Sequence, residues 1–170
     1  MLSFGPNAVI TRSIISHMYI TVHAAAGAAI GTLTLNPILA FIGGFISHLI
    51  LDMIPHGDEG IQKCIWFKTK MQCTIAAALI DFIGVTILLI FLINRVDIAL
   101  LPSIIAGMAG GIAPDALWGF HELTKTPLLG WYRRWHTNGH NFLTKKKINI
   151  IQGLLVQIPF LAVFVWFALQ

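Results

Sequence analysis

The fold class of this chain is decided by residues 72–94, which read QCTIAAALIDFIGVTILLIFLIN and contain a single charged side chain, Asp81. A helix needs about 20 mostly apolar residues to cross a bilayer core. Across all 170 residues, 56% are hydrophobic and 11% are charged, whereas a soluble domain carries about 25% charged residues. The two cysteines, Cys64 and Cys73, form no CxxC pair and indicate no disulfide framework. The sequence therefore predicts an all-α integral membrane protein of one domain.

Four further stretches have nearly the same length and apolar character, and they cover residues 17–35, 37–54, 98–118 and 148–169. The first two are short and meet at Asn36-Pro37, which predicts a tight helical hairpin. Gly27-x3-Gly31 and Gly107-x3-Gly111 permit close backbone approach, although glycine is also simply common in membrane helices. With 72–94, these stretches predict a bundle of about five transmembrane helices.

The basic residues predict the orientation of that bundle. With five spans, the N-terminus, the 55–71 loop and the 119–147 loop share one side, and Arg95 is the single basic residue on the other side. This positive-inside pattern predicts a cell (inner) membrane protein with a cytoplasmic N-terminus and an outer C-terminus. The expected partner is the lipid bilayer, and no nucleic acid is expected. The ten basic residues of the inner side are Arg12, Lys63, Lys68, Lys70, Lys125, Arg133, Arg134, Lys145, Lys146 and Lys147.

The 119–147 segment is expected to lie along the inner membrane surface as an interfacial amphipathic segment. It contains Trp131 and Trp135, and Trp66 and Trp118 are predicted on the same side. Amphipathic rings of this kind favour the headgroup level. The neighbouring basic residues either attract anionic headgroups or only set the topology.

His48, Asp52 and His56 are spaced by four residues, so a continuing helix stacks them on one face. Imidazole and carboxylate side chains at this spacing can hold a divalent cation. At about 1.5 Å per residue, His23 and His48 each lie roughly 9 Å inside their helix ends, with Asp52 and Asp115 nearer the surface. The sequence predicts a metal site in an inward-opening cavity. The alternative is that these groups only form hydrogen bonds between helices.

Other polar residues are candidates for catalysis or for extra ligation. Asp81 lies in the middle of its span. It could be a ligand, a partner that orients a ligand histidine, or a proton-relay group. His136 and His140 add two ligands if the segment is helical, although the glycine between them favours a turn. Glu122 is a candidate acid–base group or ligand. For His121, a functional role and a purely interfacial position are equally supported by the sequence.

Three segments resemble the YdjM-like family of membrane-bound metal-dependent hydrolases. They are HAAAGAAIG at 23–31, GFISHLILDMIPH at 44–56 and GGIAPD at 110–115. The family is similar to the helical zinc-dependent phospholipase C and P1 nuclease group, in which His and Asp from several helices hold zinc for phosphoester cleavage. The chain lacks the His-Arg-Gly-x-Thr-His-Ser segment of many members, and its nearest substitute is the segment 136–140. The resemblance implies a Zn²⁺ cofactor and the metal ligands His23, His48, Asp52, His56 and Asp115.

The leading hypothesis is a metal-dependent phosphoesterase that acts on a lipid or lipid-linked substrate at the cytoplasmic leaflet. Asp81, Glu122 and His136 are then the candidates for catalytic roles, and His140 is an additional ligand. The alternative is a metal-ion or proton-coupled transporter, for which a homodimer would supply the symmetry that five spans lack. A third hypothesis is a non-catalytic structural protein in which the polar groups join helices.

Overall fold

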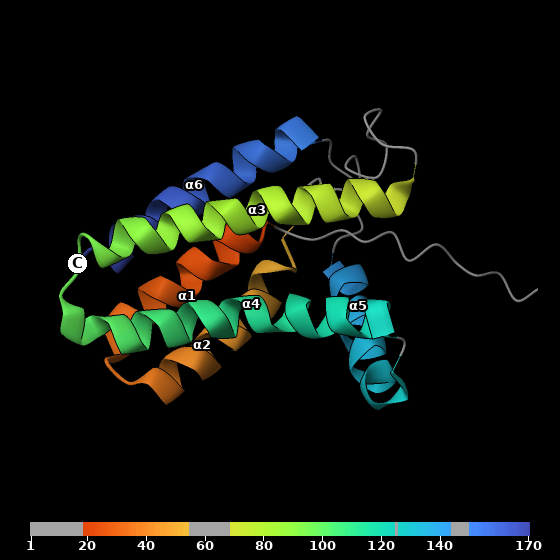
Figure 1. Ribbon diagram of the computed structural model, residues 1–170, viewed down its shortest axis with the longest axis horizontal. Helices are drawn as coiled ribbons and strands as arrows, with labels where there is room; N and C mark the ends of the chain where they lie inside the picture. Colours follow the sequence, from red (N-terminus) through yellow and green to blue (C-terminus); the bar gives the residue numbers. More distant parts are fainter. Residues whose placement is uncertain (1–18, 55–68, 125, 144–149) are drawn as a thin grey trace, which may run out of the picture.

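The computed structural model describes residues 19–54, 69–124, 126–143 and 150–170, and within these ranges it contains helices and no strands. The predicted all-α class is confirmed. The helices, drawn in Figure 1, are α1 (Ile20–Thr34), α2 (Pro37–Leu51), α3 (Lys70–Ile93), α4 (Leu101–Thr124), α5 (Gly130–Leu143) and α6 (Ile150–Ala168), with short 3-10 helices η2 (Ile98–Leu100) and η3 (Pro127–Leu129).

Three of the described helices are long and apolar enough to cross a membrane, over Ile75–Ile93, Ile98–Thr124 and Ile151–Ala168. They indicate a membrane protein. Helices α1 and α2 are apolar but have 15 residues each, a length of about 22 Å. This is shorter than the hydrocarbon core, which is about 30 Å thick. The structure therefore supports three spanning helices, and the predicted bundle of five spans is not confirmed.

Helices α1 and α2 form the hairpin that the sequence predicts. Helix α1 ends at Leu35, which has a left-handed backbone conformation with φ of 53°. Asn36 then caps α2, because its side-chain oxygen accepts hydrogen bonds from the backbone N–H groups of Ile38 and Leu39 at 3.0 and 3.1 Å. Pro37 occupies the first helical position, where its missing N–H costs nothing.

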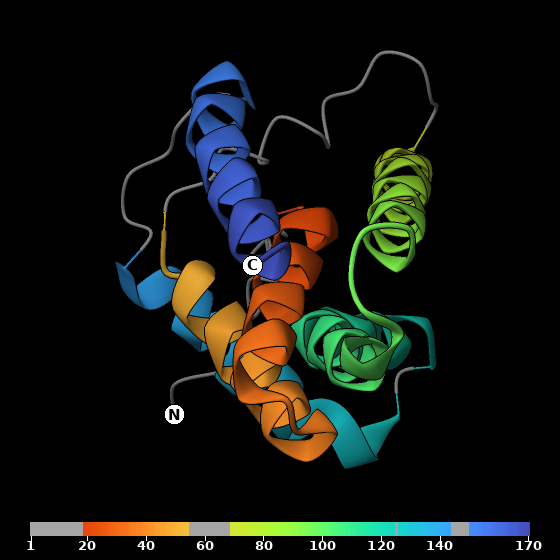
Figure 2. The same ribbon diagram turned by 90° about the vertical axis from the view of Figure 1, so that its left-hand side faces the viewer.

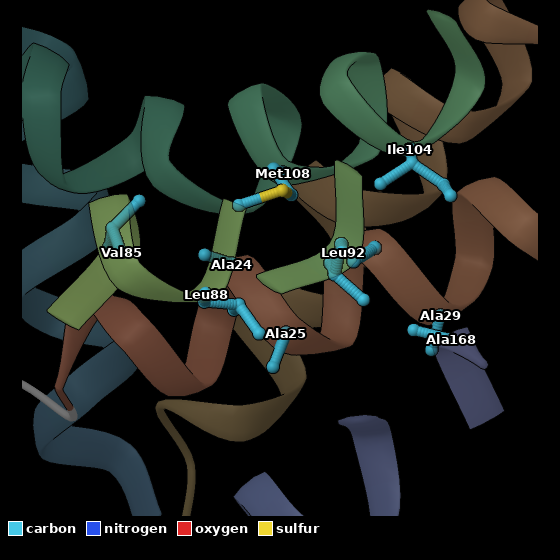
Figure 3. Close-up of a cluster of buried hydrophobic side chains, with 10 residues drawn as sticks. Ala24, Ala25, Ala29, Val85, Leu88, Leu92, Ile104, Met108 and Ala168 are labelled. Atoms are coloured by element: carbon cyan, nitrogen blue, oxygen red, sulfur yellow. The ribbon is translucent and has the colours of Figure 1, made fainter. Parts of the chain in front are cut away.

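Helix α1 lies at the centre of the bundle, with the other long helices and α2 around it (Figure 2). Its alanines pack against Val85, Leu88 and Leu92 of α3, Met108 of α4 and Ala168 of α6 (Figure 3). Small side chains on α1 let larger neighbours approach from several sides. The central position follows from this, because α1 buries an unbroken run from Val22 to Ala29.

Glycines set the distance between α4 and the hairpin. A Cβ atom on Gly27 would lie 2.0 Å from the carbonyl oxygen of Gly107, and one on Gly44 would lie 2.3 Å from that same oxygen. One turn further along α4, a Cβ atom on Gly111 would lie 2.3 Å from the carbonyl oxygen of His23. Side chains larger than hydrogen cannot occupy these positions without moving a helix. Both predicted glycine motifs therefore lie where backbones meet.

Cys73, in the first turn of α3, is disulfide-bonded. The cysteine spacing indicated no disulfide framework, and it gave no sign of the bond at this residue. Spacing alone misses such a bond, because a disulfide needs two Cα atoms within about 7 Å and not a CxxC motif.

Candidate metal centre

Four ligand-type side chains converge from three helices: His48 and Asp52 from the end of α2, Asp115 from α4 and His136 from α5. One ligand atom of each lies within 4.8 Å of those of the other three. His48 and Asp52 are one turn apart, so they share a face as their spacing predicts, and His48 Nε2 lies 3.0 Å from Asp52 Oδ2. The four residues form the cluster that is called the metal centre below.

The remaining distances in the metal centre are similar. His136 Nε2 lies 3.5 Å from His48 Nε2, 3.5 Å from Asp52 Oδ2 and 3.9 Å from Asp115 Oδ1. His48 Nε2 lies 3.6 Å from Asp115 Oδ1. Ligands that are each about 2.0–2.2 Å from a tetrahedral ion are roughly 3.3–3.6 Å from one another. Five of the six edges of such a tetrahedron are therefore present, at 3.0 to 3.9 Å.

The burial of the metal centre limits which charges it can hold. The four side chains are between 0% and 9% exposed. Two carboxylates in such an enclosed place repel each other and lose their hydration, so they need positive charge beside them. Two imidazole nitrogens and two carboxylate oxygens are a donor set that suits a divalent transition metal. The cluster fits a metal ion by both spacing and charge.

The backbone fixes the orientation of His48. Its Nδ1 atom lies 2.7 Å from the carbonyl oxygen of Gly111 on α4. A carbonyl oxygen only accepts hydrogen bonds, so Nδ1 carries a proton and donates it there. The lone pair of Nε2 can then face the metal centre, which is the arrangement that metal-binding histidines usually have.

His23, a predicted ligand, lies beside the metal centre and outside the group of four. Its Nε2 atom is 3.1 Å from Asp52 Oδ1, whereas His48 and His136 approach the other oxygen, Oδ2. Its fully buried ring stacks on that of His48, with centroids 3.9 Å apart. Asp52 therefore directs Oδ2 toward the metal centre and Oδ1 toward His23.

Asp81 binds the beginning of α1. Its carboxylate accepts hydrogen bonds from the backbone N–H groups of Ile20 and Thr21 and from the Thr21 hydroxyl. The N–H group of Tyr19 donates to Gln157 Oε1 of α6 at 2.8 Å. Side chains of two other helices thus satisfy the first amides of α1, which has no cap from its own residue Tyr19. The structure does not bring Asp81 into the group of four.

Glu122 and His121, at the end of α4, also lie outside the group of four. Glu122 forms an ion pair with Arg133 of α5, and His121 Nδ1 lies 2.9 Å from the carbonyl oxygen of Thr126. These contacts join α4 to the chain that follows it. Glu122 therefore helps to hold α5 against α4.

The side chains of two predicted ligands, His56 and His140, lie outside the described part of the structure. His56 lies outside the described residues. The backbone of His140 belongs to α5, which continues through the glycine before it, so the segment is helical and contains no turn there. The side chain of His140 lies outside the described part of the structure.

Tyr132 is a supporting residue that the sequence analysis did not identify. Its hydroxyl donates a hydrogen bond of 3.0 Å to the carbonyl oxygen of Pro114, the residue before Asp115. Burial raises the pKa of this hydroxyl, so it keeps its proton and remains a donor. The available signal was its spacing, because Tyr132 precedes His136 by four residues and shares its face of α5.

A scan against protein families and searches of curated proteins and of solved structures found no match. The features of this chain that indicate a function are therefore the four converging ligand groups of the metal centre and the fixed orientation of His48.

Proposed function

We propose that this protein is a membrane-embedded, metal-dependent hydrolase. Its metal centre would hold a divalent transition metal, Zn²⁺ in the first place, through His48, Asp52, Asp115 and His136. The observation that carries the proposal is the set of five ligand–ligand distances between 3.0 and 3.9 Å, which fit a tetrahedral ion. The YdjM-like resemblance supplies the reaction class, cleavage of a phosphoester in a lipid or lipid-linked substrate.

The surroundings of the metal centre support hydrolysis as its chemistry. A bound divalent ion supplies Lewis-acid stabilisation of the charge that develops on a phosphoester. Asp115 has the most exposed side chain of the four, at 9%, so the substrate would approach from its side. Arg133 and Arg134 on α5 are basic groups that attract anionic headgroups when they lie near a membrane surface.

The membrane arrangement that accompanies this function has α1 and α2 as short spans beside the three longer ones. The outer side chains of α2, such as Ile38, Ile46 and Ile50, are apolar and exposed, which suits contact with lipid. A hydrophobic stretch shorter than the bilayer thins it locally at modest cost. The distribution of Lys and Arg orients the metal centre toward the cytoplasm.

Metal analysis of protein purified in detergent tests the metal centre. We expect close to one zinc ion per chain in the wild type and its loss in His48→Ala and in His136→Ala. His121→Ala is the matched control, because His121 is a histidine that contacts a backbone carbonyl away from the cluster. Wild-type protein without bound metal, or equal metal content in His48→Ala and His121→Ala, would contradict the proposal.

Turnover is tested separately, with phosphoester substrates in mixed micelles. We expect phosphate-ester cleavage by the zinc-loaded protein and its loss in Asp115→Asn, while His121→Ala remains active. Zinc flux into liposomes without cleavage would instead identify a transporter and exclude the hydrolase.

A further inference from the structure

The outer face of α5 combines aromatic and basic side chains. It consists of Trp131, Arg134 and Trp135, of which Trp131 is 65% and Trp135 is 52% exposed. Leu128, just before α5, is also exposed. Tryptophan and arginine together suit the headgroup region of a bilayer, where the ring meets the acyl boundary and the guanidinium meets phosphate.

A second face of the same helix reaches the metal centre. Tyr132 and His136 are buried there, with ring centroids 5.8 Å apart. The ring of Tyr132 also lies 6.0 Å from that of Trp131 and 6.2 Å from that of Trp135. Tyr132 therefore lies next to both exposed tryptophans and next to the ligand histidine, so its ring connects the outer face of α5 with His136.

The position of α5 agrees with contact to a membrane surface. It runs across α4 near the C-terminal end of that helix (Figure 1). Because α4 is long enough to cross a bilayer, a helix that crosses it lies along the membrane plane. Among the described elements, α5 packs chiefly on α4 and η3, through contacts that include the Glu122–Arg133 ion pair and the Tyr132–Pro114 hydrogen bond. Within the described part of the chain, Trp131 and Trp135 of this outer face are both more than half exposed, so protein contacts leave most of the face open.

We propose that the outer face of α5 binds the headgroup region of the bilayer, and that this contact holds His136 in the metal centre. The inference rests on the proposed metal site and adds a partner to it, the lipid surface. Three of the four ligands come from α2 and α4, which pack on each other through glycines, whereas His136 depends on the placement of α5. The affinity of the metal centre for its ion then depends on the contact between the outer face of α5 and the lipid headgroups.

The test compares zinc affinity in lipid nanodiscs that contain anionic phospholipid. We expect Trp131→Ala with Trp135→Ala to weaken zinc binding by about 10-fold, the effect typical of groups that support a ligand, and by no more than His136→Ala. Trp166→Ala is the matched control, because Trp166 on α6 is 56% exposed and is not part of α5. Equal zinc affinity in the double variant and in Trp166→Ala would overturn the inference.

Further variants separate lipid contact from a loss of folding. Trp131→Tyr with Trp135→Tyr keeps two interfacial aromatic rings, and we expect it to retain the wild-type zinc affinity. A loss as large as in the alanine pair would overturn the role of the interface. Arg134→Gln is expected to reduce the dependence of zinc affinity on the anionic lipid fraction, and an unchanged dependence would contradict the headgroup contact. Wild-type protein that binds no zinc would instead refute the proposed function itself.

Discussion

Gly111 has two roles in the same place. Its missing side chain lets α4 approach the carbonyl oxygen of His23, and its own carbonyl oxygen accepts the Nδ1 proton of His48. The backbone contact between helices and the orientation of a ligand therefore depend on one residue. At Gly111, helix packing and ligand orientation are therefore directly linked.

Gly111→Ala is expected to destabilise the protein by about 1–3 kcal/mol, as overpacking does, and to weaken zinc binding. The added Cβ would lie 2.3 Å from a backbone oxygen, so α4 must move away from α1. Gly119→Ala is the control on the same helix, because nothing lies within 4 Å of its Cβ position. It should stabilise the helix by about 0.5–1 kcal/mol. Unfolding in denaturant measures both, and equal stability of the two variants would contradict the close approach.

His23→Gln is expected to lower zinc affinity by about 10–100-fold while the zinc content stays at one ion per chain. The reason is that His23 contacts Asp52 Oδ1, the oxygen away from the metal centre, and so orients the carboxylate with Oδ2 toward it. Competition with a chelator measures the affinity, and Co²⁺ absorption reports whether the ligand set changes. A drop in stoichiometry would show that His23 is itself a ligand.

At the scale of elements, α1 depends on its neighbours for its own beginning. Asp81 of α3 and Gln157 of α6 accept hydrogen bonds from the first amides of α1. A buried helix end without such partners would leave its N–H groups unsatisfied in apolar surroundings. The capping contacts thereby join the two outer spanning helices to the central one.

Asp81→Ala is expected to destabilise the protein by about 1–2 kcal/mol, as the loss of a helix cap does, and to leave zinc stoichiometry unchanged. Asp97→Ala is the comparison, because Asp97 caps only the short exposed helix η2 and its removal should cost less. The free energy of unfolding and metal content are measured on the same samples. If Asp81→Ala removed zinc without loss of stability, Asp81 would belong to the metal centre.

At the scale of the whole molecule, two observations favour opposite orientations in the membrane. Ten of the eleven basic residues fall on one predicted side, which favours a cytoplasmic location for that side. The disulfide at Cys73, near that same side, is typical of an oxidising compartment. The charge asymmetry acts over several loops at once, so we expect it to determine the orientation.

Labelling of single cysteines decides between the two orientations. In a background without Cys64 and Cys73, we expect Asp97→Cys to react with a membrane-impermeant maleimide on intact cells and Asn138→Cys to react only after lysis. Both positions are exposed, and they lie at opposite ends of α4, in the loop before it and in α5 after it. The reverse labelling pattern would place the disulfide in an oxidising compartment and invert the proposed topology.

Much of the fold follows from local patterns. Apolar length predicts α3, α4 and α6, and Asn36-Pro37 predicts the hairpin because both residues act on the backbone next to them. The four-residue spacing of His48 and Asp52 predicts a shared face for the same local reason. The expected five spans are not confirmed, because α1 and α2 are shorter than the apolar stretches 17–35 and 37–54: α1 begins at Ile20, and α2 ends at Leu51.

The sequence by itself determined where the long apolar helices lie, which side chains share a helix face and where glycine permits close approach, because these depend on neighbours within about one turn. Only the tertiary structure decided which faces meet. It brought Asp115 and His136 to His48 and Asp52, left His23 beside them and gave Asp81 to the end of α1. The physical reason is that glycine-lined contacts between α1, α2 and α4 fix the depth and rotation of each helix, and no local pattern specifies that rotation.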